Sequence, residues 1–474
     1  MREDVTALTL RERATIEAAR EATPELFHRP PVIDGPDELR QAGVELPNWP
    51  DTVGYMRFYP HDFIVEEIQS DGKTISTVEP SEATLGESGE VQKTVYADLV
   101  KAGIPTPEAK NRLAAALGIE VRFIGTAGIQ DAPALTAQRV SFRDASIEKL
   151  KNLKLPNLFL TRLTHGKGAT QVGELAGNRF TIVLRTEKEV GVSALEGRVA
   201  QLEREGFFNF YGLQRFGTRL RSHWFGLLLL RGDYQKAIES FLFDPGPRDL
   251  PFFKSLRERA KTHAPNWRMV REVYEACPYT LQYERRVLSA LEGGASPDRA
   301  IAGIEDQMKL WVYAYMSFLN NRLLSRGAHG EALPQEIPIP LSDRSGDRSL
   351  YRTWLDADGV HEEAFKRLVR TFPFIRLTHR TLASRITVSD VHIAACPPGV
   401  ATTFKLPRGA YATTFLMNLF LLSWGQPVPA WIQPEEVDAK KLFGTGTIEG
   451  ARTYLGEYMK HIGAHRDDEA EPSE

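Results

Sequence analysis

The segment GFFNFYGLQRFG, residues 206–217, divides the chain into two kinds of sequence. Before it, from about residue 52, short apolar runs typical of strands are mixed with helical patterns. After Gly217, the spacing of apolar residues favours helices over most of the following hundred or so residues. Strands and helices that follow one another without strict alternation are typical of one fold class, so the sequence predicts an α+β fold.

The same segment carries side chains that a nucleic-acid base would need. Aromatic rings such as that of Tyr211 can stack on any base, and the amides of Asn209 and Gln214 can hydrogen-bond to base edges. Arg215 adds a positive charge to this set. The alternative is an aromatic loop packed into the core, for which the three glycines and four polar groups are less suitable. The segment therefore indicates a surface that binds RNA.

A carboxylate stands on a turn between two expected strands. The stretch GIQDAPALTAQ, residues 128–138, contains Asp131 and follows a strand expected at residues 121–124. Before that strand, the pattern predicts a helix over residues 106–117 with Thr106 as its N-cap. A carboxylate held rigidly and partly desolvated on such a turn would be a good nucleophile or base. From this segment alone, an aspartate that merely caps a turn is the commoner case.

Positive charge is concentrated locally, although the chain is nearly neutral. It has 474 residues with 59 Lys+Arg against 62 Asp+Glu, a balance that does not by itself indicate nucleic-acid binding. Arg215, Arg219 and Arg221 form one basic cluster. Such clusters can contact phosphates, or they can be solvated faces of helices and strands. A second cluster has a single acid, Glu174, and seven basic residues: Lys149, Lys151, Lys154, Arg162, Lys167, Arg179 and Arg185.

A further candidate lies in LPRGAYATT, residues 406–414, where an aromatic side chain stands on a turn that opens an apolar helix. The surrounding pattern predicts a strand, a turn and a helix over residues 403–422. Tyr411 could reach a pocket, or it could close the N-terminus of the helix. Taken alone, the second role is the commoner one.

Composition and missing motifs exclude several classes of protein. The two cysteines stand in no CxxC or Cys/His pattern, which argues against a disulfide scaffold and a structural zinc site. The longest apolar stretches are too short for a membrane span, and the N-terminus is not a signal peptide, so a cytoplasmic protein is expected. No phosphate-binding or dinucleotide-binding motif is complete, and no cofactor is expected. A metal-dependent hydrolase using scattered His and Asp residues is a remote alternative.

Taken together and in this order, the segments resemble the tRNA pseudouridine synthase D (TruD) family. The resemblance also includes GYMRFYPHDFIVEE at residues 54–67, GNRFTIVLR at residues 177–185 and a helix at residues 314–319. It extends from about residue 52 to residue 422. NFYGLQRFG, residues 209–217, is the specific motif, whereas the other motifs are individually weak but collinear.

The resemblance implies a discontinuous catalytic domain of pseudouridine-synthase type with an inserted, mostly helical TRUD domain. It also implies RNA as the partner, above all tRNA, and a monomer is favoured. The expected organisation is an N-terminal extension at 1–50, the first part of the catalytic domain at 51–220, the insert at 221–385, the return of the catalytic domain at 386–425, and a C-terminal extension and tail at 426–474.

The resemblance also assigns roles to residues. The family's catalytic aspartate falls on Asp131, and its lysine before the PxDF turn falls on Arg57. The expected reaction is isomerisation of a uridine to pseudouridine, at uridine 13 in the D-arm of tRNA, without a metal or a redox cofactor. The positions expected to contact the substrate are Phe63, Asn209 and Tyr411 from the family pattern, together with Tyr211, Gln214 and Arg215 from the aromatic segment.

Departures from the family pattern bear on activity. The lysines that usually flank the catalytic aspartate are replaced by Gln130 and Ala132, so this loop lacks cations that would lower the carboxylate pKa and attract phosphate. Tyr211 stands where phenylalanine is usual, and Asn320 precedes Asn321 where an aromatic residue is usual. These changes indicate an altered or relaxed substrate. The alternative is a catalytically weak or inactive RNA-binding protein on the same fold.

Overall fold

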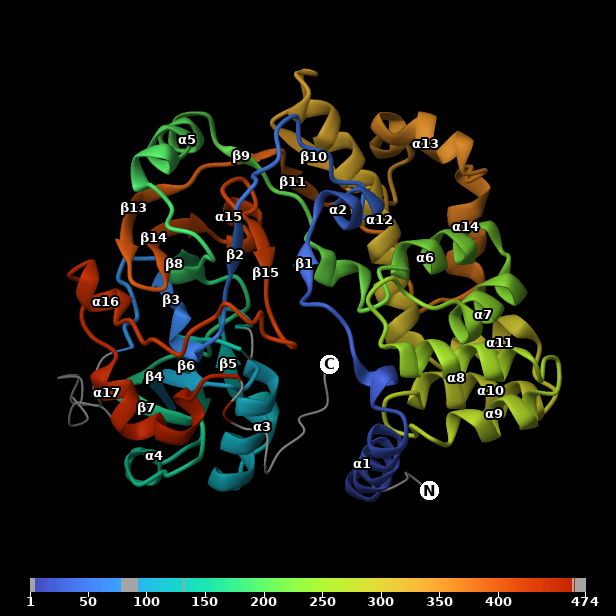
Figure 1. Ribbon diagram of the computed structural model, residues 1–474, viewed down its shortest axis with the longest axis horizontal. Helices are drawn as coiled ribbons and strands as arrows, with labels where there is room; N and C mark the ends of the chain where they lie inside the picture. Colours follow the sequence, from blue (N-terminus) through green and yellow to red (C-terminus); the bar gives the residue numbers. More distant parts are fainter. Residues whose placement is uncertain (1–4, 78–92, 131–132, 463, 465–474) are drawn as a thin grey trace.

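The computed structural model describes residues 5–77, 93–130, 133–462 and 464. A strand-rich part lies on the left of Figure 1 and a helical part on the right. The strands are β1 (Ile33–Asp34), β2 (Val53–Tyr55), β3 (Phe63–Gln69), β4 (Thr94–Ala102), β5 (Ile124–Thr126), β6 (Leu135–Arg143), β7 (Leu158–Gly166), β8 (Leu175–Arg185), β9 (Phe207–Phe208), β10 (Glu336–Pro338), β11 (Thr381–Ala383), β12 (Arg385–Ile386), β13 (Ser389–Cys396), β14 (Gly399–Pro407) and β15 (Leu421–Ser423).

The α-helices are divided between the two parts and the two ends of the chain. They are α1 (Val5–Ala22), α2 (Pro36–Gln41), α3 (Thr106–Leu117), α4 (Ile147–Lys151), α5 (Val192–Glu205), α6 (Ser222–Arg231), α7 (Tyr234–Phe243), α8 (Pro251–Lys261), α9 (Trp267–Tyr274), α10 (Gln282–Glu292), α11 (Pro297–Ala302), α12 (Glu305–Ala328), α13 (Arg352–Ala357), α14 (Glu362–Thr371), α15 (Ala412–Leu416), α16 (Ala439–Leu442) and α17 (Glu449–Leu455).

Within the described residues, eleven strands form one mixed sheet with the main order β1-β15-β2-β8-β3-β6-β4-β7. β8 is antiparallel to β3 and also to β14, which enters the sheet after the helical part of the chain. Gly177 allows the close approach of β14, because a Cβ there would lie 2.1 Å from the Leu406 carbonyl oxygen. The sheet is therefore assembled from two stretches that the helices separate in sequence, and the α+β prediction is confirmed.

The helical part is centred on the contact between α6 and α12. Gly226 of α6 lies directly on α12, since a Cβ there would be 2.1 Å from the carbonyl oxygen of Trp311. The ring of Trp311 packs against Phe225 and Phe241, each with a centroid separation of 4.9 Å. This apolar cluster is continuous with the core on one face of the sheet, so the two parts share one core.

The N-terminal residues pack on both parts. The carboxylate of Glu12 in α1 accepts hydrogen bonds from the backbone N–H groups of Tyr279 and Thr280, at 2.8 and 2.9 Å. β1 pairs with β15 at the edge of the sheet. The segment that follows contributes buried side chains to the shared core: Leu39, Ala42, Val44 and Leu46.

The C-terminal residues cover the other face of the sheet. Lys440 of α16 is fully buried, forms an ion pair with Glu66 of β3, and donates a hydrogen bond to Ser76 at 2.9 Å. The helix α17 and the turn after it pack on Ile64 and Leu135 through Ile448, Ala451, Leu455 and Met459. The five-part division of the chain stays a prediction, and the acidic tail lies outside the described residues.

Three local expectations are corrected. Thr106 is the first helical residue of α3 rather than its cap, which is Pro105. Residues 121–123 form a short 3-10 helix, so the strand β5 begins only at Ile124. The helix expected up to residue 422 ends at Leu416, and the chain turns back into the sheet as β15. Among the described residues, no helix is long and apolar enough to cross a membrane.

Candidate active site

The loop that leads into Asp131 is fixed by polar side chains up to Gln130. The Gln130 N–H donates to the hydroxyl of Thr106 at 2.9 Å, and its carbonyl accepts from the buried Lys101 ammonium at 3.3 Å. The Thr106 hydroxyl donates in turn to Gln138, whose amide donates to the Gly128 carbonyl at 3.1 Å. Asp131 and Ala132 lie outside the described residues. The residues that precede them are thus held by side chains from β4, α3 and β6.

The sheet brings the Arg57–Phe63 turn to the edge where this loop ends. β3 and β6 are parallel, with Ile64 opposite Leu135, so the residues before each strand meet at the same edge of the sheet. Phe63 is buried, and the Arg57 guanidinium lies 4.2 Å from the centre of its ring. Arg57 has φ 66°, a left-handed conformation that is uncommon for a residue with a side chain.

A buried ion pair fixes this turn from behind. The Arg185 guanidinium donates to both carboxylate oxygens of Asp62, at 2.9 and 3.1 Å, and both side chains are almost fully buried. Arg185 also lies over the ring of Phe58, 4.8 Å from its centre. A buried ion pair with two hydrogen bonds and an aromatic neighbour fixes the position of the backbone around it. Arg185 therefore stabilises the turn, and its guanidinium is not exposed to a ligand.

The aromatic segment and the Tyr411 turn are joined directly. The Asn209 amide donates to the Gly409 carbonyl at 3.0 Å, and the Thr414 hydroxyl donates to the Phe210 carbonyl at 2.9 Å. Within the described residues, the buried Oδ1 of Asn209 has no hydrogen-bond partner. A buried acceptor without a partner is unusual in a folded protein and marks this position as a candidate for ligand binding.

Two tyrosines form a surface above this junction. The ring centroids of Tyr211 and Tyr411 are 6.1 Å apart, and Tyr411 is 41% exposed. The Arg215 guanidinium lies 5.2 Å from the Tyr211 ring, while Gln214 is exposed beside it in sequence. Burial, reinforced by the neighbouring Tyr411, raises the pKa of Tyr211 to about 12. A tyrosine hydroxyl is protonated at neutral pH even without this shift, so the Tyr211 hydroxyl can donate a hydrogen bond.

The Asp131 loop and the Tyr411 turn are linked through the residues before β8. The Gly173 N–H donates to the Ala127 carbonyl at 2.8 Å, and the Gly173 carbonyl accepts from the Arg408 guanidinium at 2.8 Å. On β8, Asn178 accepts from the Gln130 amide at 3.1 Å. The three segments that carry Asp131, Asn209 and Tyr411 therefore converge on one region at the edge of the sheet.

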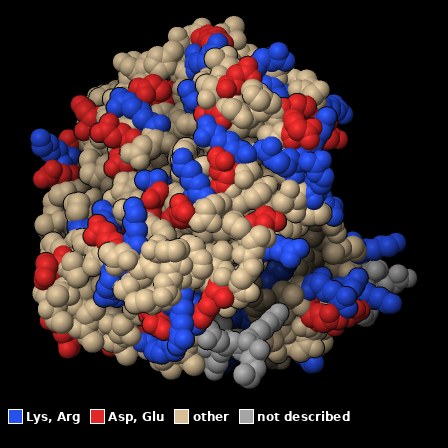
Figure 2. Space-filling model, turned by 90° about the vertical axis from the view of Figure 1, so that its right-hand side faces the viewer, with Lys and Arg blue, Asp and Glu red and all other residues tan. Residues whose placement is uncertain are grey.

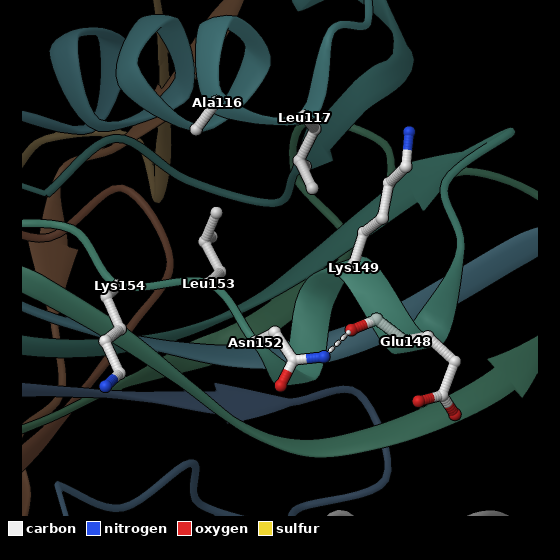
Figure 3. A pocket seen from close by; sticks show the side chains of 7 residues that line it. All are labelled: Ala116, Leu117, Glu148, Lys149, Asn152, Leu153 and Lys154. Atoms are coloured by element: carbon white, nitrogen blue, oxygen red, sulfur yellow. Dashed lines mark hydrogen bonds between the residues drawn. The ribbon is translucent and has the colours of Figure 1, made fainter.

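The basic clusters expected to follow phosphates are mostly structural. Arg162 and Arg139 pair with the buried Asp98, and Arg179 pairs with Glu66. Arg219 is largely buried, with 11% of its side chain exposed, and donates to the Phe241 carbonyl at 2.8 Å. Lys167 and the lysines of the 149–154 stretch remain exposed, and Lys149 and Lys154 line a shallow pocket between α3 and α4 (Figure 3). The phosphate-binding role expected for these clusters is thus absent at their buried arginines.

Sequence patterns missed the residue that joins the two parts of the molecule at the site. Asn321 of α12 is fully buried. Its Oδ1 accepts from the Tyr211 N–H at 2.8 Å, and its amide donates to the Tyr211 carbonyl at 2.9 Å and to the Ala42 carbonyl at 2.8 Å. One side chain thus satisfies three backbone groups. Two adjacent asparagines in a helical pattern offer no signal that distinguishes this role of Asn321.

Comparison with known proteins gives a consistent result. The family model for tRNA pseudouridine synthase D (TruD) matches residues 46–338. The tRNA pseudouridine synthase D of Geobacter sulfurreducens is 31% identical over 432 residues, which cover 81% of this chain and 97% of that protein. The probable tRNA pseudouridine synthase D of Methanopyrus kandleri is 30% identical over 338 residues, 66% of this chain and 82% of that protein.

A solved structure has the same fold. The crystal structure of the putative tRNA pseudouridine synthase D from Methanosarcina mazei superposes with a TM-score of 0.64 at 22% identity, covering 81% of this chain and 98% of that one. The family model and the relatives define the class as an RNA-modifying isomerase. The chain belongs to the tRNA pseudouridine synthase D family.

Proposed function

We propose that this protein converts a uridine of tRNA to pseudouridine, with uridine 13 in the D-arm as the target and Asp131 as the catalytic carboxylate. The observation that carries the proposal is the convergence of three segments at one sheet edge. These segments are the anchored loop that enters Asp131, the Asn209–Gly409 junction and the Tyr211–Tyr411 surface. The target position within tRNA rests on the family resemblance.

The reaction needs a rigid carboxylate and a place for an extruded base. The C1′–N1 bond breaks, a C1′–C5 bond forms, N1 gains a proton and C5 loses one. An ionised Asp131 would act either as the nucleophile at C1′ or as the base that removes the C2′ proton. Both routes require the uridine to leave its stack, and aromatic rings such as those of Tyr211 and Tyr411 compensate for lost stacking.

The contacts of the described residues suit a neutral uracil. Asn209 offers a buried acceptor, and Tyr211 offers a protonated hydroxyl, so a donor and an acceptor are present for the uracil edge. The Arg57 charge over Phe63 stands beside the end of the Asp131 loop. It supplies positive charge to a loop that has neither flanking lysine of the family pattern.

The test is tritium release from tRNA labelled at C5 of uridine, because forming the C1′–C5 bond frees that hydrogen. Wild-type protein and Asp131→Asn are compared on unmodified tRNA transcripts with uridine or cytidine at position 13. We expect release by wild type from the uridine-13 transcript, and release lower by one equivalent per tRNA from the cytidine-13 transcript. Asp131→Asn should release no tritium while binding tRNA with nearly wild-type affinity.

Each other result has a distinct meaning. Turnover by Asp131→Asn would remove Asp131 from the mechanism. Equal release from both transcripts would leave pseudouridine formation in place and reject position 13. Binding of tRNA without release by any variant would favour the inactive RNA-binding protein on the same fold.

A further inference from the structure

A basic stretch connects the helical part back to the sheet. From Thr371 to Ser389 the chain carries three arginines and one histidine and no acidic residue. It runs from the end of α14 through β11 and β12 to β13. We name this stretch the return segment. It lies near the top of Figure 1, between the two parts, where β9, β10 and β11 come together.

The return segment runs alongside the aromatic segment of the site. β12 pairs with β9, with Arg385 opposite Phe208, the residue directly before Asn209. The Arg385 guanidinium lies 4.1 Å from the centre of the Phe208 ring. Arg380 is exposed, and its charge is close enough to Tyr211 to act against the burial that raises the pKa of that tyrosine. The two arginines therefore flank the aromatic segment at its start and at Tyr211.

A hydrogen bond from Gln201 lowers the pKa of the exposed Glu205 carboxyl and the charge of Arg385 adds to that effect, so the charge of Arg385 is only weakly compensated. In the described parts of the chain, neither Arg380 nor Arg385 forms an ion pair with a carboxylate. Arg385 donates only to the carbonyls of Glu205 and Gly206, at 3.3 and 3.4 Å. The nearby Glu336 carboxylate instead accepts the Thr381 hydroxyl at 2.8 Å. Arg162, Arg179 and Arg185 are the opposite case, since each pairs with a buried carboxylate.

The helical face away from the site does not show such an excess. Figure 2 shows basic and acidic side chains interspersed over the face that the helical part presents on its outer side. Exposed ion pairs of the helical part include Arg268 with Glu272 and Arg370 with Glu363. A surface on which positive and negative side chains alternate attracts a polyanion only weakly. Exposed arginines that are not paired with carboxylates bind RNA phosphates more strongly, because counterions are released on binding.

We propose that the return segment is a phosphate-binding element of the RNA surface, with Arg380 and Arg385 each contacting an RNA phosphate next to the extruded uridine. The inference rests on the proposed function for the position of the uridine, and it adds the residues that hold the backbone on either side. Arginine suits this role because its planar fork can bind two phosphate oxygens at once. The stretch at residues 149–154, in contrast, contributes no phosphate contact.

The experiment measures the salt dependence of tRNA binding by the full chain. Fluorescence anisotropy of labelled tRNA gives Kd between about 50 and 200 mM KCl for wild type, Arg380→Gln/Arg385→Gln and the control Lys149→Gln/Lys154→Gln. Both variants lose two exposed charges. The control lysines line the pocket between α3 and α4 in Figure 3, at the lower end of the sheet in Figure 1.

The expected result is a selective loss of slope. The arginine variant should reduce the slope of log Kd against log salt by about 1.5, since each lost phosphate contact removes about 0.7 to 0.9. The lysine variant should keep the wild-type slope. Arg380→Lys/Arg385→Lys retains both charges and should also keep it, which separates charge from local structure.

An unchanged slope in the arginine variant would overturn the inference. So would an equal loss in Arg380→Lys/Arg385→Lys, because charge would then not be the cause. Tritium release measured on the same preparations distinguishes this inference from the proposed function. Release with an unchanged slope rejects the phosphate contacts alone, and a reduced slope without release by wild type rejects the catalytic proposal alone.

Discussion

The loop that enters Asp131 and the aromatic segment at residues 209–217 meet at one site but are held in different ways. The loop is anchored by Lys101, Thr106 and Gln138, all from the first strand-rich stretch of the chain. The aromatic segment is anchored from elsewhere, by Asn321 of the helical part and by the turn at residues 407–411. The loop up to Gln130 is therefore held by contacts within one stretch of the chain, whereas the position of the aromatic segment depends on the assembly of distant stretches.

The largest effect is expected where the local anchor is removed. Lys101→Met takes a buried ammonium from the carbonyls of Ile104 and Gln130, which it contacts at 2.8 and 3.3 Å. We expect kcat to fall by about 100-fold, the cost of misplacing a catalytic group by about 1 Å, while KM for tRNA changes little. Steady-state kinetics checks this. Lys154→Met, an exposed lysine, is the control, and an undiminished kcat in Lys101→Met would show that the loop holds its position without this anchor.

The second effect tests the anchor from the helical part. Asn321→Leu leaves the Tyr211 N–H and carbonyl and the Ala42 carbonyl without their partner, which should lower the free energy of unfolding by about 3 kcal/mol. KM for tRNA should rise more than kcat falls, because the base-receiving surface is displaced. Urea denaturation and kinetics provide the two measurements.

The adjacent Asn320 is a matched control for that prediction. Its Oδ1 accepts only a long hydrogen bond of 3.3 Å from the Tyr351 hydroxyl, which also donates to the Pro338 carbonyl at 2.9 Å. Asn320→Leu should therefore cost about 1 kcal/mol or less. If both variants lost the same free energy of unfolding, the hydrogen bonds between Asn321 and the Tyr211 backbone would not be what stabilises the protein here.

A third prediction concerns the sheet around the local anchor. Glu67 of β3 stands opposite Asn178 of β8, the partner of Gln130, and burial raises the pKa of Glu67 to about 7. The folded protein then holds this proton more tightly than the unfolded chain. Stability should thus fall as pH rises from about 4.5 to 7, by about 3 kcal/mol at most.

Glu67→Gln should remove that loss and raise stability at pH 8 relative to wild type, with little change at pH 4. Denaturation curves at the two pH values measure it. The exposed Glu196→Gln should leave the pH dependence unaltered. A wild-type stability that does not fall between pH 5 and 8 would contradict the assignment of a raised pKa to this carboxyl.

The smallest effect sharpens the description of the aromatic segment. Tyr211→Phe keeps the ring that Arg215 and Tyr411 contact and removes only the hydroxyl, so kcat/KM should fall by less than about threefold. Tyr211→Ala, which removes the stacking area, should cost at least about tenfold. A complete loss in Tyr211→Phe would show that the hydroxyl takes part in the reaction.

Pattern reasoning succeeded where a signal is local. The helix at residues 106–117 follows from signals over a few residues, and both of its bounds are confirmed, although Pro105 rather than Thr106 is its cap. It failed where a partner decides. In the sequence, Lys149 and Arg185 belong to the same basic cluster. In the structure, Lys149 is exposed to solvent, whereas Arg185 is buried and paired with Asp62, and only the tertiary structure shows this difference.

The sequence by itself determined the α+β class, the order of the motifs and the identity of the candidate residues, because these depend on residue type and spacing. Only the tertiary structure decided which of them meet. The parallel pairing of β3 with β6 places the Phe63 turn beside the Asp131 loop, and the antiparallel pairing of β14 with β8 brings Tyr411 across more than two hundred residues of chain. Such contacts depend on backbone pairing and shared burial between distant stretches, which no local pattern records.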